Sequence, residues 1–204
     1  MANIIITIGR QFGSGGRHIG ELVAKELNIP FYDEELISLA AEKSELCKDA
    51  IKDADERSAN SLLYTLAMGS SAMLHTSHYN MPINDKLFLI QSDIIRDAAS
   101  KGSAVIVGRC ADYVLRDHPR TVNVFIYASD DFRINNVASR GNIPKNEAQT
   151  LITKTDKRRA NYYNFYTGNR WGAMENYDLA IDAGKLGAEK AAKLIAEYAR
   201  IFSE

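Results

Sequence analysis

The sequence contains little cysteine, and that scarcity excludes two classes of protein. Among its 204 residues only Cys47 and Cys110 carry a thiol, and no CxxC pair occurs. Two cysteines so far apart form neither a disulfide framework nor a zinc-ligand pattern. Reduced thiols in a cytoplasm are therefore expected.

Long apolar runs are also missing. No stretch approaches the roughly 18 apolar residues that a membrane-spanning helix needs. The short apolar run at 4–8 lacks the basic flank of a signal peptide. We therefore expect a cytoplasmic protein with no membrane partner.

Neither sign of charge is in excess. Lysine and arginine number 25 against 26 acidic residues, which gives a net charge of −1. Without a positive field over the whole molecule, a nucleic acid polymer is not an expected partner. Any phosphate binding must come from arginines placed locally. Apolar residues make up 46% of the chain and charged residues 25%, which is ordinary for a globular protein.

Short runs rich in β-branched residues predict the strands of a sheet. Four such runs occupy residues 4–8, 104–107, 121–127 and 179–182, and a fifth strand is expected near 30–32. Their continuous apolar character is typical of parallel strands buried on both faces. Stretches with apolar residues at helical spacing lie between them. The sequence thus predicts an α/β fold, a parallel sheet of about five strands flanked by helices.

Two regions depart from this alternation. Residues 40–84 combine a charged helical start with a polar, methionine-rich middle, and we expect helices followed by an exposed loop near 69–84. Residues 141–177 carry many charges and aromatic rings between two strands, which favours a helical lid. Neither region has the features of an independent domain, so residues 1–204 are expected to form a single domain.

The segment "IIITIGRQFGSGGRHIGELVAKEL" at 4–27 has the order strand, glycine-rich loop, helix. Its glycines allow positive φ angles, and the N–H groups of the loop and the helix N-terminus can converge on an anion. Counted back from Gly16, the phosphate-binding pattern GxxxxGK[ST] fails at Gln11, Arg17 and His18. Arg17 still offers a guanidinium for phosphate oxygens. The alternative is a tight turn that carries a surface arginine.

Charged residues elsewhere are placed to hold an anion or a sugar. Arg109 follows the strand 104–107, where ligands bind in open α/β sheets, and Asp33 follows the expected fifth strand. Each has the plainer alternative of a helix-capping residue. Arg133 and Arg140 lie on a helix that Ser129 is expected to cap. The run "TKTDKRR" at 153–159 is either part of a lid that closes on a polyphosphate or a solvated helix face.

Taken together, these segments resemble the cytidylate kinase-like family, a nucleoside monophosphate kinase group of the P-loop kinases. The resemblance covers nearly the whole chain and is carried by "ITIGRQFGSGGRHIG", "PFYDEELI", "AVIVGRCADYVL", "FIYASDDFRI", "DKRRANYYNFYTG" and "YDLAIDAGKLGAEKAAKLIAEYA". It implies a P-loop kinase-type sheet with a helical lid at about 141–177 and an acceptor-binding insert at about 40–84. It also implies ATP as donor, Mg²⁺ as cofactor and a small-molecule phosphate acceptor.

The resemblance also implies roles for individual residues. The donor phosphates would lie on the glycine loop, formed by Gly13, Ser14, Gly15, Gly16, Arg17 and His18. The acceptor would contact Asp33, Arg109 and Arg158. The cations that steady the transferring group would come from Arg17, Arg133, Arg140 and Arg159. No metal-ligand set is expected, so Mg²⁺ would be held mainly by phosphates and water, with help through water from Ser14 or Asp33.

The sequence therefore predicts phosphoryl transfer from ATP to a small acceptor, most simply a nucleoside monophosphate such as CMP. Two alternatives remain open at this point. The loss of the loop's Lys and Ser/Thr favours a nucleotide-binding sensor or regulatory protein with little turnover. The absence of a recognisable pattern in the insert favours a kinase for a non-nucleotide small molecule.

Overall fold

The computed structural model describes residues 3–43 and 82–203. The described residues belong to two compact units, one formed by the chain up to Glu34 and from Ile95 onward, the other by residues 35–94. Most of the predicted exposed loop at 69–84 and of the predicted acceptor-binding insert lies outside the described residues; residues 83 and 84 belong to a helix instead of the loop. In the described part of the chain, no helix is both long and apolar enough to span a bilayer.

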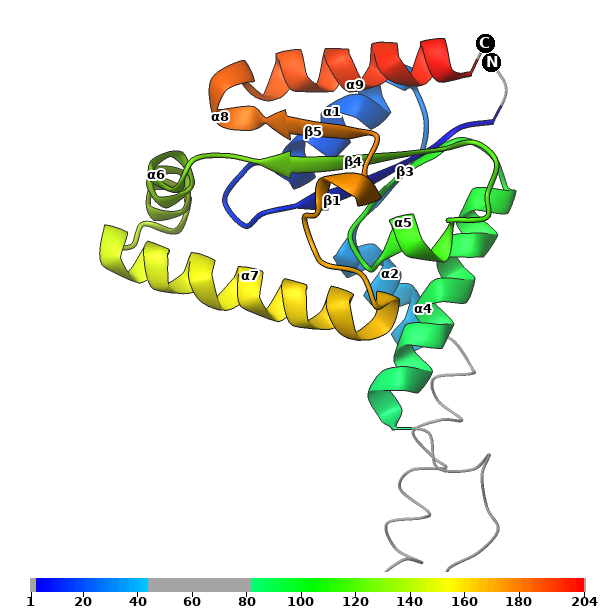
Figure 1. Cartoon of the computed structure of the whole chain (residues 1–204), viewed down its shortest axis with the longest axis horizontal. Helices are drawn as coiled ribbons and strands as arrows, with labels where there is room; N and C mark the ends of the chain where they lie inside the picture. Colours follow the sequence, from blue (N-terminus) through cyan, green and yellow to red (C-terminus); the bar gives the residue numbers. More distant parts are fainter. Residues whose placement is uncertain (1–2, 44–81, 204) are drawn as a thin grey trace, which may run out of the picture. The chain divides into compact units, whose positions relative to one another are not determined.

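A five-stranded parallel sheet forms the centre of the first unit, as the sequence predicted. Its spatial order is β2-β3-β1-β4-β5, and the bounds are β1 (Ile5–Arg10), β2 (Phe31–Tyr32), β3 (Ala104–Val107), β4 (Thr121–Tyr127) and β5 (Leu179–Asp182). Every residue of β3 is buried, which explains its uninterrupted apolar sequence. Because all strands are parallel, their carboxyl ends meet at one edge of the sheet (Figure 1).

Two helices cover one face of this sheet and pack on each other. They are α1 (Gly16–Leu27) and α9 (Ala188–Phe202), which follows the short helix α8 (Ala183–Leu186). Ile19 and Val23 of α1 and Ile195 of α9 are fully buried against the strands. Their helical spacing explains why the apolar pattern of these segments predicted helices.

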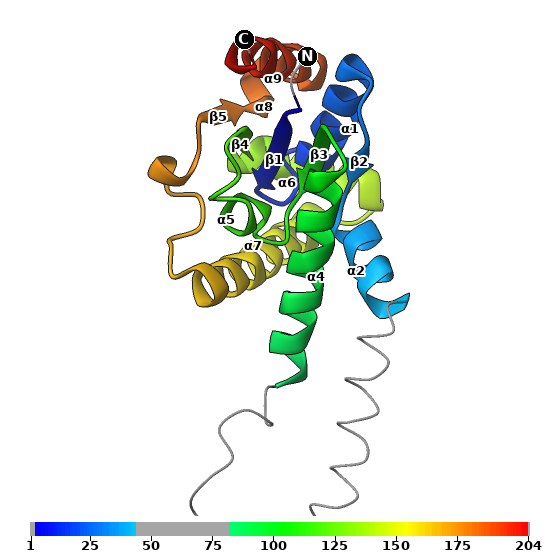
Figure 2. The same cartoon turned by 90° about the vertical axis from the view of Figure 1, so that its right-hand side faces the viewer.

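Three helices and a 3₁₀ turn complete the first unit. They are α5 (Ala111–Val114), α6 (Asp130–Gly141), α7 (Lys145–Thr167) and the turn Met174–Asn176. The side chain of Ser129 caps α6 by accepting a hydrogen bond from the Phe132 N–H, which confirms the predicted cap. Both views place α7 on the side of the sheet opposite α9 (Figures 1 and 2). Helix α7 thus occupies much of the region predicted as a lid.

The second unit contains most of two further helices. Helix α2 spans Glu34–Lys43 and helix α4 spans Ile83–Ser100. Within this unit Ala41 and Ile90 are buried together, and Leu87 and Ile94 pack against them. This small apolar cluster joins the two helices where the described chain enters and leaves residues 44–81.

Candidate active site

The glycine-rich loop between β1 and α1 has the geometry of an anion cradle. Gly13 and Gly15 have φ angles of +80° and +87°, which side chains rarely tolerate. Within the two described ranges, no acceptor receives a hydrogen bond from the N–H groups of Gly13, Gly15 or Gly16. Since α1 begins at Gly16, its positive dipole end faces the same place. These N–H groups fit the phosphates of a nucleotide.

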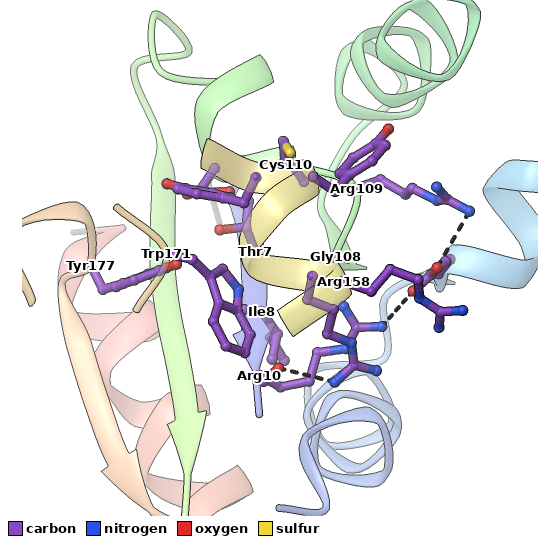
Figure 3. A pocket seen from close by; sticks show the side chains of 16 residues that line it. Thr7, Ile8, Arg10, Gly108, Arg109, Cys110, Arg158, Trp171 and Tyr177 are labelled. Atoms are coloured by element: carbon purple, nitrogen blue, oxygen red, sulfur yellow. Dashed lines mark hydrogen bonds and ion pairs between the residues drawn. The ribbon is translucent and has the colours of Figure 1, made fainter. Parts of the chain in front are cut away.

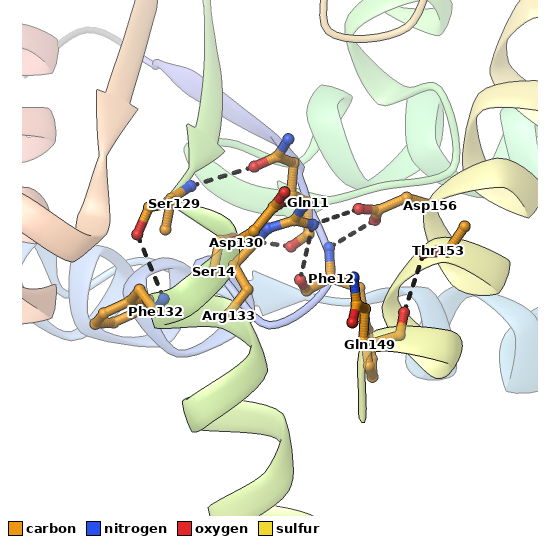
Figure 4. Close-up of polar contacts among 11 residues, drawn as sticks. Gln11, Phe12, Ser14, Ser129, Asp130, Phe132, Arg133, Gln149, Thr153 and Asp156 are labelled. Carbon is orange, nitrogen blue, oxygen red and sulfur yellow. Dashed lines mark hydrogen bonds and ion pairs between the residues drawn. The ribbon is translucent and has the colours of Figure 1, made fainter. Parts of the chain in front are cut away.

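The loop is held in place by α6 and α7 as well as by its own residues. The Asp156 carboxylate accepts the Phe12 N–H at 2.7 Å and an Arg133 N–H at 2.5 Å. Arg133 also donates to the Phe12 carbonyl and to Asp130 at 2.6 Å, and Asn136 donates to the Gly13 carbonyl. Figure 4 shows Arg133 between the loop and Asp156. Arg133 is only 7% exposed, so in this structure it positions the loop.

Arg17 lies at the start of α1 but is paired with carboxylates. Its Nε donates to Asp33 Oδ2 at 2.7 Å, and its Nη1 donates to Glu21 at 2.6 Å. The Asp33 side chain is almost fully buried, whereas that of Arg17 is 56% exposed. Arg17 was expected to contact the donor and Asp33 the acceptor. In the structure they form one ion pair that joins α1 to the end of β2.

Four arginines line a cavity at the carboxyl ends of β1 and β3. They are Arg10, Arg109, Arg158 and Arg159, and the cavity also contains Glu34. Glu34 accepts from Arg10 at 2.8 Å and lies 3.3 Å from Arg109, while Arg159 donates to the Arg10 carbonyl. Figure 3 shows Arg10, Arg109 and Arg158 reaching this region from three different segments. The two carboxylates that line the cavity, Glu34 and Asp112, cannot balance four guanidinium groups, so the cavity suits a dianionic phosphate.

The electrostatics of this cavity shift the pKa values of several of its groups, among them Glu34 and Arg159. Burial acts to raise the pKa of Glu34, but the charges of Arg10 and Arg109 outweigh it and hold that pKa below its ordinary value. Burial, with the neighbouring charge of Arg10, lowers the pKa of Arg159 to about 10. Both groups remain charged at neutral pH, so the cavity keeps its excess of positive charge.

The turn that carries Arg109 has an unusual backbone. Gly108, Arg109 and Cys110 all have left-handed φ angles, of +82°, +53° and +55°. Non-glycine residues adopt such angles only where the surroundings hold them. Two contacts do so here: the Arg109 guanidinium lies over the Tyr162 ring at 5.6 Å, and Tyr163 of α7 donates to Asp112 at 2.6 Å. Helix α7 and the Arg109 turn are therefore fixed to each other.

Aromatic residues form the other end of the cavity. Trp171 and Tyr177 line it together with Tyr163 and Asp112. Trp171 packs edge-on against Phe125, and burial raises the pKa of Tyr177. Burial also raises the pKa of Asp112, whose carboxylate accepts a hydrogen bond from the Tyr163 hydroxyl. This end of the cavity therefore offers flat aromatic surface and one hydrogen-bond acceptor, the Asp112 carboxylate. Such a surface suits a planar ring of a ligand.

A second hollow adjoins the helix end of the loop. It is lined by Ser14, Gly15 and His18 of the loop and α1, by Phe132, Asn136 and Arg140 of α6, and by Ala183, Gly187 and Ala188 after β5. Arg140 forms no ion pair with any residue that the structure describes. The hollow thus includes Ser14 and Gly15 of the loop and reaches along one face of α6 to the residues after β5.

The two side chains expected to help hold Mg²⁺ through water already have protein partners. The buried Ser14 hydroxyl donates to the Gln11 carbonyl, and Asp33 is paired with Arg17. Among the residues described, no three His, Cys, Asp or Glu side chains cluster as metal ligands. A Mg²⁺ ion at this loop would therefore be held by the phosphates of the nucleotide and by water.

The structure thus distributes the predicted site residues over three places. Arg109, Arg158 and Arg159 share the arginine-lined cavity, and Ser14, Gly15, His18 and Arg140 share the second hollow. Arg17, Asp33 and Arg133 lie in ion pairs beside the loop. Sequence analysis missed Arg10 and Glu34. Arg10 carries the same signal as Arg109, a Gly-Arg pair that follows an apolar run. The glycine pattern next to it was interpreted instead.

The strand order and the loop that joins β1 to α1 define a P-loop kinase fold. A shikimate kinase from Bacteroides thetaiotaomicron shares this fold, with a TM-score of 0.54 at 14% identity, over 98% of this chain and 99% of that one. The chain belongs to the cytidylate kinase-like family, whose model matches residues 5–185. Membership supports phosphoryl transfer from a nucleotide donor to a small molecule.

Two further relatives match nearly the whole chain. A cytidylate kinase from Sulfurisphaera tokodaii is 22% identical over 96% of this chain and 94% of its own length. The crystal structure of an uncharacterized protein from Eubacterium ventriosum has a TM-score of 0.74 at 30% identity, and the match covers 97% of this chain and 98% of that one.

Proposed function

We propose that the chain transfers the terminal phosphoryl group of ATP to a nucleoside monophosphate, and that CMP is its acceptor. The observation that carries this proposal is the cavity in which four arginines (Arg10, Arg109, Arg158 and Arg159) outnumber two carboxylates. Such an excess of positive charge suits an acceptor that already bears a phosphate. A phosphate would add negative charge that offsets these guanidinium groups, and a neutral alcohol would add none.

The proposed reaction needs alignment and charge neutralisation more than covalent chemistry. The donor phosphates would accept hydrogen bonds from the N–H groups of the loop, and the acceptor phosphate would lie among the arginines. The aromatic end of the same cavity would take the base. A cytidylate kinase among the relatives supports CMP as the first acceptor to test.

The rival proposal is a nucleotide-binding sensor. It is favoured by the absence of lysine and of a serine or threonine where α1 begins. It leaves unexplained why a second, arginine-lined cavity adjoins the loop, because a sensor of ATP alone needs no acceptor site.

The test measures ADP formation from MgATP with CMP, dCMP, UMP, AMP and GMP, and with shikimate as a non-nucleotide alcohol. We expect turnover with CMP well above the ATP-only background. Arg109→Ala should raise the KM for CMP, and the exposed Arg120→Ala serves as the matched control. ATP binding without turnover on the whole panel would support the sensor, and turnover on shikimate alone would overturn a nucleotide acceptor.

A further inference from the structure

The structure changes how the loop aligns with the pattern GxxxxGK[ST]. In the sequence analysis, Gly16 was placed at the second glycine of that pattern. Strand β1 ends at Arg10, four residues follow, and Gly15 then precedes the first residue of α1. In a strand–GxxxxGK[ST]–helix unit, the two glycine positions are therefore those of Arg10 and Gly15. Gly16 stands in the lysine position and Arg17 in the Ser/Thr position. The lysine has become a glycine, and the first glycine has become an arginine.

These two changes are sterically complementary. A Cβ atom added at Gly16 would lie 2.6 Å from the Arg10 Cβ and 3.1 Å from its Cγ. Real side chains essentially never approach so closely, so Gly16 is small because the arginine side chain lies over it. Gly16 has no left-handed φ angle that would otherwise demand glycine. The Arg10 side chain thus begins where the lysine side chain of the usual motif begins.

The Arg10 side chain starts beside Gly16 of the loop, and its guanidinium lines the acceptor cavity. It packs against Gly108, where an added Cβ would overlap its Nη1. It donates to Glu34 at 2.8 Å, and its side chain is only 13% exposed (Figure 3). Arg159 donates to the Arg10 carbonyl at 3.1 Å. Arg10 is therefore a held, nearly buried cation at the junction of the two proposed substrate sites.

Arg17, the cation expected from the sequence, lies differently. It is paired with the buried Asp33 and with Glu21. To contact a phosphate it would have to leave the carboxylate that it neutralises. Among the described residues, the side chain that lies nearest to the Cβ position of Gly16 is that of Arg10.

We propose that Arg10 replaces the P-loop lysine, and that its guanidinium binds the donor's β- and γ-phosphate oxygens. This proposal rests on the proposed function, because it assumes that a nucleotide triphosphate lies on the loop. Glu34 holds the guanidinium in place before the nucleotide binds, and the phosphate oxygens then take over its N–H groups. A guanidinium suits this position because its planar fork can contact two oxygens at once.

The test exchanges the two residues. Arg10→Gly should weaken MgATP binding by at least tenfold and lower kcat by about 100- to 1,000-fold, as loss of a transition-state contact commonly does. Gly16→Lys alone should also lose affinity, because its side chain overlaps Arg10. The double variant R10G/G16K restores the usual spacing, removes both Arg10 contacts, leaves the Ile126 Cβ at 3.3 Å, and should recover at least tenfold over Arg10→Gly. Arg120→Ala is the charge-matched control.

The outcomes separate this inference from the proposed function. MgATP affinity measured by calorimetry tests Arg10 even where the wild-type chain turns over no acceptor. An Arg10→Gly variant with unchanged ATP affinity and kcat, or one in which only the KM for CMP rises, would overturn the inference. Arg10→Met, which keeps most of the side-chain volume, gives the same comparison where the glycine variant does not fold.

Discussion

The Nε of Arg17 lies 2.7 Å from Oδ2 of Asp33, and this pair joins an exposed guanidinium to a buried carboxylate. The pair connects the first turn of α1 to the residue that follows β2. A buried carboxylate that loses its charged partner is costly, commonly by about 1–3 kcal/mol. The pair is therefore expected to contribute to the stability of the loop region.

The first prediction concerns this pair. Arg17→Ala should lower the free energy of unfolding by about 1–3 kcal/mol in urea denaturation. The double variant R17A/D33N should recover part of that loss, because the buried charge is removed with its partner. Glu21→Gln, which removes only the exposed partner, should cost about 0–1 kcal/mol. An Arg17→Ala variant as stable as the wild type would contradict this account.

Asp156 gives a second prediction. Its two carboxylate oxygens hold the Phe12 N–H and Arg133, so Asp156→Ala should leave a buried guanidinium with fewer partners and release the loop. We expect a loss of about 3–5 kcal/mol in stability and weaker binding of MgATP. Asp131→Ala, an exposed acidic residue on α6, is the control. Unchanged ATP affinity in a destabilised Asp156→Ala would show that the bridge does not position the loop.

Gly108 provides a third prediction. Alanine there meets both a left-handed φ of +82° and the Arg10 guanidinium. Gly168 has a similar φ of +71°, but an added Cβ at that position meets nothing within 4 Å. Both alanine variants should lose stability by roughly 1 kcal/mol from backbone strain. Only Gly108→Ala should also weaken ATP binding, and equal binding in the two variants would contradict the position of Arg10.

The pH dependence of stability is the fourth prediction. Arg10 and Arg109 hold the pKa of Glu34 below its ordinary value of 4.5 against the effect of burial. Its ion pairs therefore contribute stability that is fully present above pH 4.5 and is lost as the pH falls through the lower, folded-state pKa. The stability difference between wild type and Glu34→Gln should be constant from pH 6 to 8 and shrink below pH 4.5. A stability difference between the two proteins that grows on acidification would contradict this prediction.

Much of the fold followed from periodicity alone. The strands at 104–107, 121–127 and 179–182 were predicted with the bounds that the structure shows, because each is a short, mostly apolar run between helical patterns. Strand β3 is buried throughout, whereas in β5 only Ile181 is buried. The two-residue strand β2 was found only by its place in the expected alternation. The strand order could not be predicted, since it depends on which helices cover which face.

The site was less accessible from the sequence. The arginines of α7 were expected in a lid, and two of them line the cavity beside Arg109. The arginine at the first glycine position and the glycine at the lysine position were not recognised, because the pattern was aligned on Gly16 instead of Gly15. The correct register needed the end of β1 and the start of α1, and element boundaries are what sequence patterns locate least well. The pairing of Arg17 with Asp33 needed the tertiary approach of α1 to β2.

The most direct test of the central claim is a crystal structure with a non-hydrolysable ATP analogue. The account predicts that its β- and γ-phosphates lie on the N–H groups of Gly13, Gly15 and Gly16, with the adenosine toward Arg140. A triphosphate seated elsewhere, with the loop N–H groups bound only to water, would contradict it.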